Sequence, residues 1–382
     1  MSTASRPRDQ HDSARDAARP DRVVTVSVND PVAAEHGPVA IAGAAAPVNG
    51  PASPTGSATM NRAAADADSD HPGFVALAMD LTKARLSLLV LWTTATGAML
   101  AAHWAAERTG ASLNVPRLLW TLIGTALAAG SAGAFNQALE HRRDSVMRRT
   151  RRRPVPAGHL SPAAALGIAL GLGTLGVGLL LAFVGTLAAG LAALTIVMYA
   201  AMYTPMKPRT TLNTFVGAIV GAIPPMIGWA SVTGGLEAGA WALFALLFVW
   251  QIPHFLALAW MYREDYATGG FHMLPASDPT GRLTAQATLA GCLLLVPVAL
   301  SITLVGVGGW IYSAGSILLA VWMSARALRF VRERTDEAAR SVFLASLLYL
   351  TVVLILAVAD PTEMVHPIEV AQPGGGSAMM GS

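Results

Sequence analysis

Apolar residues follow one another in long runs, separated by short segments that carry most of the polar residues. About 20 apolar helical residues are needed to cross the hydrocarbon core of a bilayer, so each run predicts a membrane-spanning helix. The runs begin near Leu86, Leu118, Pro162, Leu187, Leu212, Ala238, Thr284, Gly309 and Val342. The sequence lacks the alternating pattern of a membrane β-barrel. We therefore expect an all-α membrane protein, a bundle of about nine transmembrane helices.

Composition supports a location in the membrane, and charge indicates an orientation. Of 382 residues, 53% are hydrophobic and 13% charged, and the mean hydropathy is +0.50. The formal net charge is only +3, but lysine and arginine gather before the first run and after the second, fourth, sixth and eighth. Because basic loops stay in the cytoplasm, we expect the N-terminus and these connections to be cytoplasmic and the C-terminus to lie outside.

The two ends of the chain differ from the apolar part between them. Residues 1–72 are rich in Ala, Pro, Ser, Asp and Arg and predict a disordered extension. This segment has neither the apolar region of a signal peptide nor the acid-poor composition of a mitochondrial transit peptide, which favours a bacterial cytoplasmic (inner) membrane. Residues 362–382 predict a flexible tail. Residues 73–361 are then one membrane domain.

Oxygen-bearing side chains are spaced four residues apart at the end of the second run. Asn136, Glu140 and Asp144 belong to the segment NQALEHRRDSVMRRTRRRP, residues 136–154. Each step of four residues turns a helix by about 40°, so the three side chains share one face. Carboxylate and amide oxygens suit Mg²⁺, which usually bridges protein carboxylates to substrate phosphates. This face is the first candidate metal site.

Seven arginines accompany the acidic face. Guanidinium groups bind phosphate oxygens in a planar fork, so the segment predicts a site for a metal-bound diphosphate. The alternative is a topology signal or a contact with anionic lipid headgroups, but neither requires carboxylates at helical spacing. Nucleic-acid binding is disfavoured, because the segment has no interleaved aromatic residues. The arginines are Arg142, Arg143, Arg148, Arg149, Arg151, Arg152 and Arg153.

A second acidic pair, Glu264 and Asp265, follows the sixth run in WMYREDYATGGFHMLP, residues 260–275. Four runs separate this segment from the first, so both are expected on the same membrane face. The two carboxylates are further candidate metal ligands, with plain solvation at the membrane boundary as the alternative. Two acidic clusters with arginines on one side suit a polyphosphate held by more than one metal ion.

Three further polar side chains lie at or within the apolar runs. Tyr203 and Lys207 are four residues apart after the fourth run, where Lys207 can neutralise a leaving diphosphate and the Tyr203 hydroxyl can donate to it. Anchoring of this pair at the membrane interface is the alternative. His254 lies within the sixth run, and an ionisable residue inside a membrane is a functional candidate. A neutral histidine bonded to a neighbouring helix is the other interpretation.

These motifs together resemble those of the UbiA-type intramembrane prenyltransferases, and within them the protohaem IX farnesyltransferase (haem O synthase) branch. Residues 136–154 are similar to the first signature of that family. Residues 253–275, PHFLALAWMYREDYATGGFHMLP, are similar to its second signature, and Tyr203-x-x-x-Lys207 to its middle-loop motif. The resemblance runs from about residue 79 to residue 360.

The resemblance implies transfer of a farnesyl group from farnesyl diphosphate to a vinyl group of haem B, with addition of water, giving haem O for terminal oxidases. It implies a central apolar cavity for the isoprenoid tail and Mg²⁺ as cofactor. His254 would contact a haem propionate or the iron. The implied partners are the bilayer and a downstream haem A synthase or terminal oxidase assembly. The implied site residues are Asn136, Glu140, Asp144, Asp265 and Glu264 for metal, Arg149, Arg153, Lys207 and Tyr203 for diphosphate, and Asp144, Asp265, Lys207 and Tyr203 for catalysis.

Two other functions stay open at this point. A UbiA-type prenyltransferase acting on a quinone precursor or chlorophyllide would have a similar diphosphate site. A secondary transporter of an anionic metabolite would place paired broken helices and charges near the bilayer midplane. The charges here lie at helix ends on one face, which favours the enzyme.

Overall fold

The protein is described by a computed structural model that covers residues 73–110 and 112–362. The expectations for residues 1–72 and for the tail from 363 onward fall outside these ranges. Within them, nine helical segments are long and apolar enough to cross a membrane, which confirms the predicted all-α architecture.

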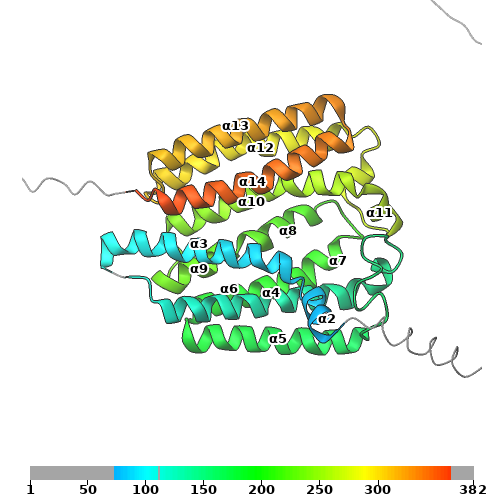
Figure 1. The fold of residues 1–382 in the computed structure, drawn as a ribbon, viewed down its shortest axis with the longest axis horizontal. Coiled ribbons are helices and arrows are strands. Elements are labelled where there is room, and N and C mark those ends of the chain that lie inside the picture. Colours follow the sequence, from blue (N-terminus) through cyan, green and yellow to red (C-terminus); the bar gives the residue numbers. More distant parts are fainter. Residues whose placement is uncertain (1–72, 111, 363–382) are drawn as a thin grey trace, which may run out of the picture. The chain divides into compact units, whose positions relative to one another are not determined.

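The helices lie roughly side by side along one direction (Figure 1). The order is α2 (Phe74–Leu81), α3 (Ala84–Thr109), α4 (Val115–Asp144), α5 (Pro162–Phe183), α6 (Thr186–Val197), η1 (Met198–Tyr203), α7 (Thr204–Met206), α8 (Asn213–Ala222), α9 (Pro224–Thr233), α10 (Ala238–Met261), α11 (Arg263–Thr268), η2 (Leu274–Ser277), α12 (Arg282–Leu304), α13 (Trp310–Glu333) and α14 (Asp336–Ala359).

Capping side chains determine where several helices begin. At the start of α4, Asn114 Oδ1 accepts a hydrogen bond from the backbone N–H of Arg117 at 2.9 Å. At the start of α14, Thr335 Oγ1 accepts one from the backbone N–H of Ala338 at 3.2 Å. Such caps satisfy N–H groups that have no partner within the helix. The second cap explains why the last span begins before the expected position near Val342.

Two spans contain a break in their regular α-helix. The fourth consists of α6, the π-helical turn η1 and α7, and the fifth consists of α8 and α9 with a break at Ile223. Pro224 and Pro225 follow this break, and proline has no N–H to donate into a helix. Irregular backbone at membrane depth is tolerated where it lines a cavity. Both interruptions border the cavity described below.

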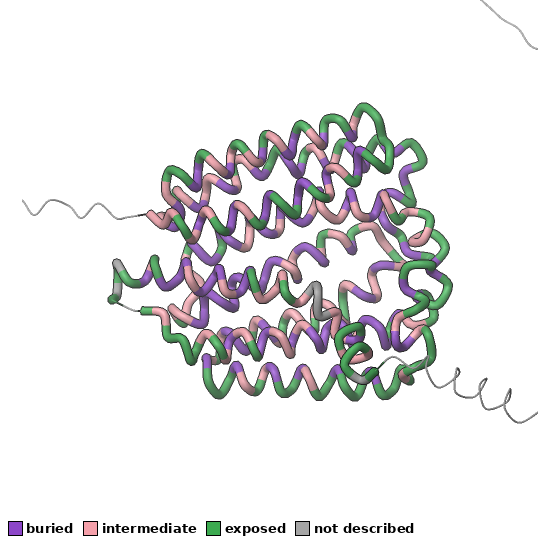
Figure 2. Tube along the Cα trace, viewed as in Figure 1, coloured by how far each residue is buried: buried purple, intermediate pink, exposed green. Residues whose placement is uncertain are grey.

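Glycines allow α3 and α9 to pack closely against each other. A Cβ atom on Gly97 would overlap the carbonyl oxygen of Pro225, and one on Gly228 would overlap that of Thr94. Close approach of this kind gives the van der Waals contact that holds membrane helices together. Buried residues lie where helices meet, whereas outward faces are exposed (Figure 2). Those faces carry large apolar side chains such as Leu304, which is 85% exposed, as expected of a surface in contact with lipid.

Candidate active site

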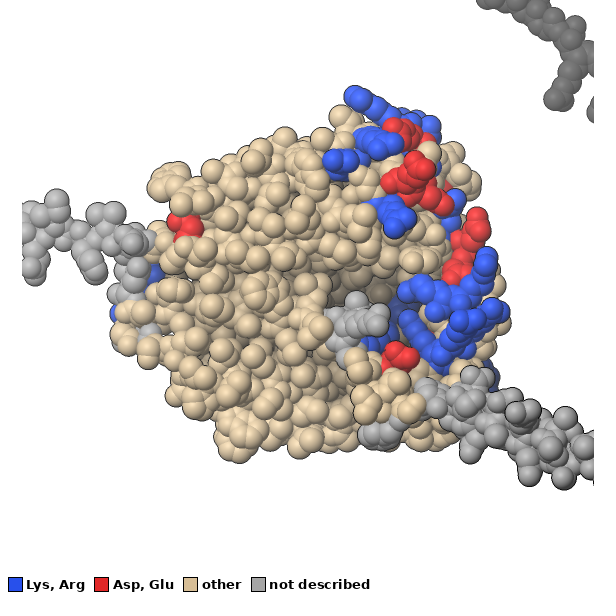
Figure 3. All heavy atoms as spheres, viewed as in Figure 1, with Lys and Arg blue, Asp and Glu red and all other residues tan. Residues whose placement is uncertain are grey.

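Most charged side chains in the view of Figure 3 gather at one end of the bundle. Segments that follow different spans meet there. Lys207, after the fourth span, contacts Glu140 of α4, and Asp265, after the sixth, contacts the backbone of Arg148. The prediction that the loops after the second, fourth and sixth spans share one face is therefore confirmed.

The acidic face of α4 is buried. Asn136, Glu140 and Asp144 are 1%, 6% and 1% exposed, respectively. Asn136 Nδ2 donates a hydrogen bond to Glu140 Oε2 at 2.6 Å, which confirms that side chains one helical turn apart share a face. Burying ionised carboxylates is costly unless cations and hydrogen bonds compensate them.

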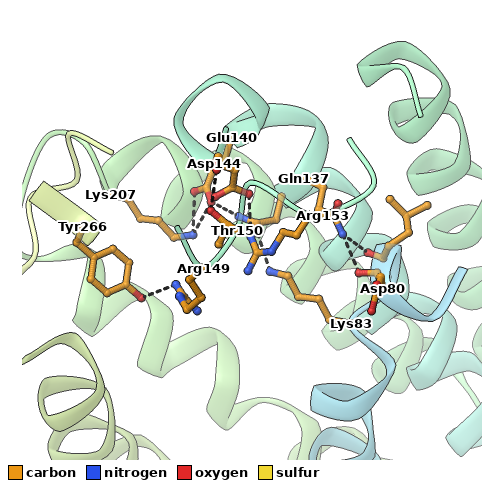
Figure 4. A network of polar contacts seen from close by, with 12 residues as sticks. Asp80, Lys83, Gln137, Glu140, Asp144, Arg149, Thr150, Arg153, Lys207 and Tyr266 are labelled. Carbon is orange, nitrogen blue, oxygen red and sulfur yellow. Dashed lines mark hydrogen bonds and ion pairs between the residues drawn. The ribbon is translucent and has the colours of Figure 1, made fainter. Parts of the chain in front are cut away.

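Three basic side chains lie against this face, and two of them, Lys207 and Arg153, pair directly with its carboxylates (Figure 4). Lys83 Nζ donates to Asn136 Oδ1 at 2.6 Å. Lys207 Nζ lies 2.8 Å from Glu140 Oε1. Arg153 Nη1 lies 2.8 Å from Asp144 Oδ2. These cations of the site, Lys83, Lys207 and Arg153, surround the oxygens of the acidic face.

Lys83 is a site residue that the sequence does not single out, because a lysine just before the first span indicates only the orientation of the helix. It lies between α2 and α3 in the left-handed conformation, with φ 52° and ψ 45°. Positive φ is uncommon for residues other than glycine, and such strain often occurs at functional sites. Burial, with repulsion from Arg153 and Lys207, lowers the pKa of Lys83 to about 7.

Lys207 is held charged beside the acidic face. Burial acts to lower its pKa, but the Glu140 carboxylate outweighs burial and keeps the pKa above its usual value. The Lys207 ammonium also lies 4.6 Å from the ring centroid of Tyr203. Tyr199, four residues earlier in η1, packs against Tyr203 with centroids 5.1 Å apart. The π-helical turn thus brings a second tyrosine to the site, which the sequence spacing did not predict.

Asp265 and Glu264 occupy different environments. The Asp265 carboxylate accepts hydrogen bonds from the backbone N–H groups of Arg148 at 3.2 Å and Arg149 at 3.1 Å. The Arg149 guanidinium in turn donates to Tyr266 Oη at 3.2 Å. Glu264 is exposed. The structure therefore brings Asp265 and Arg149 together at the arginine segment but leaves Glu264 at the surface.

The predicted metal ligands do not form a single cluster. Of the described residues, no three His, Cys, Asp or Glu side chains are placed to hold a metal ion together. The acidic face instead offers two carboxylates and an amide oxygen. This set fits a Mg²⁺ ion whose remaining ligands would be phosphate oxygens and water. Glu140 Oε1 is buried and receives no hydrogen bond, although Lys207 Nζ lies 2.8 Å away. The site thus suits an ion that binds together with a phosphate-bearing substrate.

A cavity of about 300 Å³ extends from this site into the bundle. Lys83, Tyr199 and Tyr203 line it at the charged end, and His254 lines it from α10. The wall formed by α4 is made of small residues: Thr125, Ala128, Ala129, Ala132 and Gly133. The predicted central apolar cavity is confirmed, and its size and lining suit a flexible apolar chain with a charged headgroup.

Comparison with known proteins agrees with this geometry. Residues 90–350 match the model of the UbiA prenyltransferase family. A protein of Solibacter usitatus named protoheme IX farnesyltransferase is 42% identical over 286 residues, covering 74% of this chain and 97% of the relative. One of the same name from Salinibacter ruber is 43% identical over 243 residues, covering 64% and 86%.

Solved structures share the fold at low sequence identity. That of a digeranylgeranylglyceryl phosphate synthase superposes with a TM-score of 0.62 at 13% identity, covering 74% of this chain and 97% of the other. That of a UbiA homolog from Archaeoglobus fulgidus bound to DMAPP and Mg²⁺ has a TM-score of 0.52 at 14% identity, covering 74% and 99%. The match to the family model and the identity to full-length relatives show that this chain belongs to the UbiA prenyltransferase family.

Proposed function

We propose that the protein transfers the farnesyl group of farnesyl diphosphate to a vinyl group of haem B, with addition of water, and so makes haem O. The observation that carries the proposal is the buried acidic face of α4, surrounded by three cations, at the charged end of an apolar cavity. The names of the relatives, protoheme IX farnesyltransferase, support the choice of substrates.

The diphosphate would bind at the acidic face with magnesium. Asn136, Glu140 and Asp144 supply oxygen ligands, and Asp265 lies on the neighbouring segment. A magnesium ion held by these residues would supply positive charge that offsets the charge of the diphosphate. A fold relative solved with DMAPP and Mg²⁺ is consistent with this use of the site. Glu264, being exposed, would act only at a longer distance from the metal.

The cations of the site stabilise the departing diphosphate. Lys207 and Arg153 already face the carboxylates that would hold the metal, and Arg149 lies on the same arginine segment. As the C–O bond to the farnesyl group breaks, negative charge develops on the diphosphate, and preorganised cations lower the energy of that state. Lys83 adds a further positive group when protonated, and the Tyr203 hydroxyl is positioned to donate to an oxygen of the leaving group.

The apolar cavity governs the second half of the reaction. The farnesyl C1 atom, left electron-deficient, forms a carbon–carbon bond with the haem vinyl group, which becomes a carbocation. Water then adds its oxygen to that carbocation and releases a proton. The wall of small residues on α4 would hold the isoprenoid and limit water until the carbon–carbon bond has formed.

The setting that we propose is a bacterial cytoplasmic membrane, with the charged end of the bundle in the cytoplasm. The arginines at this end support that orientation by the positive-inside rule. A haem-modifying enzyme in the bilayer would deliver its product to a haem A synthase or to terminal oxidase assembly.

The test uses full-length protein in detergent with haem B, farnesyl diphosphate and Mg²⁺, and follows the mass of the haem. A gain of one farnesyl group plus water, lost in Asp144→Ala, is the expected result. Glu333→Ala is a matched control, because this exposed carboxylate lies away from the acidic face and pairs with Arg329 on its own helix. Diphosphate release with a quinone precursor or chlorophyllide, but not with haem, would contradict the choice of acceptor. Absence of diphosphate release with every acceptor would contradict prenyl transfer itself.

A further inference from the structure

His254 of α10 is held between two aromatic rings at the wall of the cavity. Its ring centroid lies 4.9 Å from that of Trp250 and 4.8 Å from that of Phe343 of α14, with interplanar angles of 22° and 29°. Trp250 is fixed in turn, because its Nε1–H donates to the backbone carbonyl of Ser346 at 2.7 Å. The plane of the imidazole is therefore set by packing between α10 and α14.

A single hydroxyl group decides which imidazole nitrogen carries the proton. Ser346 Oγ donates its hydrogen to the carbonyl oxygen of Phe343 at 2.6 Å, and His254 Nδ1 lies 2.8 Å from the same Oγ. Because a hydroxyl has only one hydrogen, a Ser346 hydroxyl that donates to the Phe343 carbonyl can only accept from His254, so this network assigns the proton to Nδ1. The neutral imidazole then has a bare Nε2, for which no hydrogen bond is found among the described residues.

The bare nitrogen distinguishes between the two contacts that the resemblance implied for His254. An ionised haem propionate only accepts hydrogen bonds, and a nitrogen without a proton cannot donate one to it. A lone pair on one nitrogen, with the other N–H held by a second hydrogen bond, is the arrangement of metal-ligating histidines. Histidine is also a common axial ligand of haem iron. The geometry favours the iron.

We propose that His254 Nε2 is an axial ligand of the iron of the acceptor haem and that Ser346 is a positioning residue that fixes its tautomer. This inference rests on the proposed function, in which haem is the acceptor. Ligation at the α10 wall would hold the macrocycle through its iron, independently of the diphosphate site at the end of α4. Binding of the two substrates is then separable by mutation.

Haem binding to the full-length protein is measured in detergent without farnesyl diphosphate or Mg²⁺, so that no product forms. Wild-type protein is expected to show absorption and EPR spectra of histidine-ligated haem. His254→Ala should lose this signature, and added imidazole should restore it. Ser346→Ala is expected to weaken haem affinity by about 10- to 100-fold, the usual effect of removing the partner of a ligating histidine. The control is His103→Ala, an exposed histidine in α3.

The outcomes distinguish an error in the proposed iron ligand, His254, from an error in the proposed farnesyl transfer. A ligation signature that persists in His254→Ala overturns the proposal, even if the wild-type protein farnesylates haem. Loss of the signature that imidazole does not restore, with Ser346→Ala unaffected, indicates a structural histidine and also overturns it. Wild-type protein that neither ligates nor farnesylates haem overturns the proposed function. Asp144→Ala should retain the signature while losing product formation.

Discussion

Replacement of Lys207 by Met removes the cation from a buried ion pair. Lys207 Nζ lies 2.8 Å from Oε1 and 3.1 Å from Oε2 of Glu140, and the two side chains are 10% and 6% exposed. Removing one partner of a buried pair costs about 3–5 kcal/mol, because the remaining charge is left uncompensated. Glu140 keeps the hydrogen bond from Asn136 Nδ2. We therefore expect a loss near the lower end of this range, about 3 kcal/mol.

The same replacement removes a positive group from the proposed diphosphate site. Loss of one preorganised group that stabilises developing negative charge lowers kcat by about 100- to 1000-fold, or about 2.7–4 kcal/mol. We expect Lys207→Met to show a loss of that order. Lys207→Arg keeps the charge and should retain more activity, although a guanidinium does not match the geometry of an ammonium.

Two measurements separate these effects. Thermal unfolding in detergent reports stability, and release of diphosphate at saturating farnesyl diphosphate and haem B reports kcat. Glu140→Gln combined with Lys207→Met removes both charges and should recover most of the lost stability. If kcat of Lys207→Met stayed within about threefold of wild type while stability fell, Lys207 would serve only to compensate Glu140, and its role at the diphosphate would be refuted.

Three further predictions concern other parts of the structure. Asp265→Asn weakens the acceptor of two backbone N–H groups and should lower kcat/KM for diphosphate release on the order of tenfold. Glu264→Gln, at an exposed position, should change kcat/KM by no more than about twofold. Equal effects of the two variants would contradict the different roles given to Asp265 and Glu264. Burial holds the pKa of Lys83 at about 7, so binding of diphosphate above that pH should take up a proton. The association constant for inorganic diphosphate is measured by calorimetry in metal-free buffer at several pH values. Its logarithm should fall more steeply with rising pH in wild type than in Lys83→Met, and the two slopes should differ by up to about one unit per pH unit. Equal slopes would contradict this proton uptake by Lys83. Gly228→Ala should push α9 away from α3 and lower the free energy of unfolding by about 1–3 kcal/mol in thermal unfolding, whereas Gly178→Ala, where a Cβ meets no atom within 4 Å, should be tolerated.

Much of the architecture is encoded locally and could be predicted from the sequence. A run of apolar residues long enough to cross the bilayer specifies a spanning helix without reference to the rest of the chain, and nine such segments are found among the described residues. The shared face of Asn136, Glu140 and Asp144 follows from helical geometry alone. The meeting of the basic and acidic loops at one end follows from the number of spans between them. Spacing and hydropathy therefore sufficed for the fold class and for the shared polar face of α4.

The partners of these residues depended on how the helices pack. Lys83 reaches Asn136 across 53 residues of sequence, and Lys207 reaches Glu140 across 67. The left-handed turn at Lys83 and the π-helical turn that presents Tyr199 have no periodic signature in the sequence. The different environments of Asp265 and Glu264 also depend on neighbouring segments, as does the contact between His254 Nδ1 and Ser346 Oγ. The sequence by itself determined which elements form and which face of each is polar, because those properties depend on residues within a few turns. Only the tertiary structure decided which charge meets which, because a buried ion pair joins segments whose separation along the chain carries no local signal.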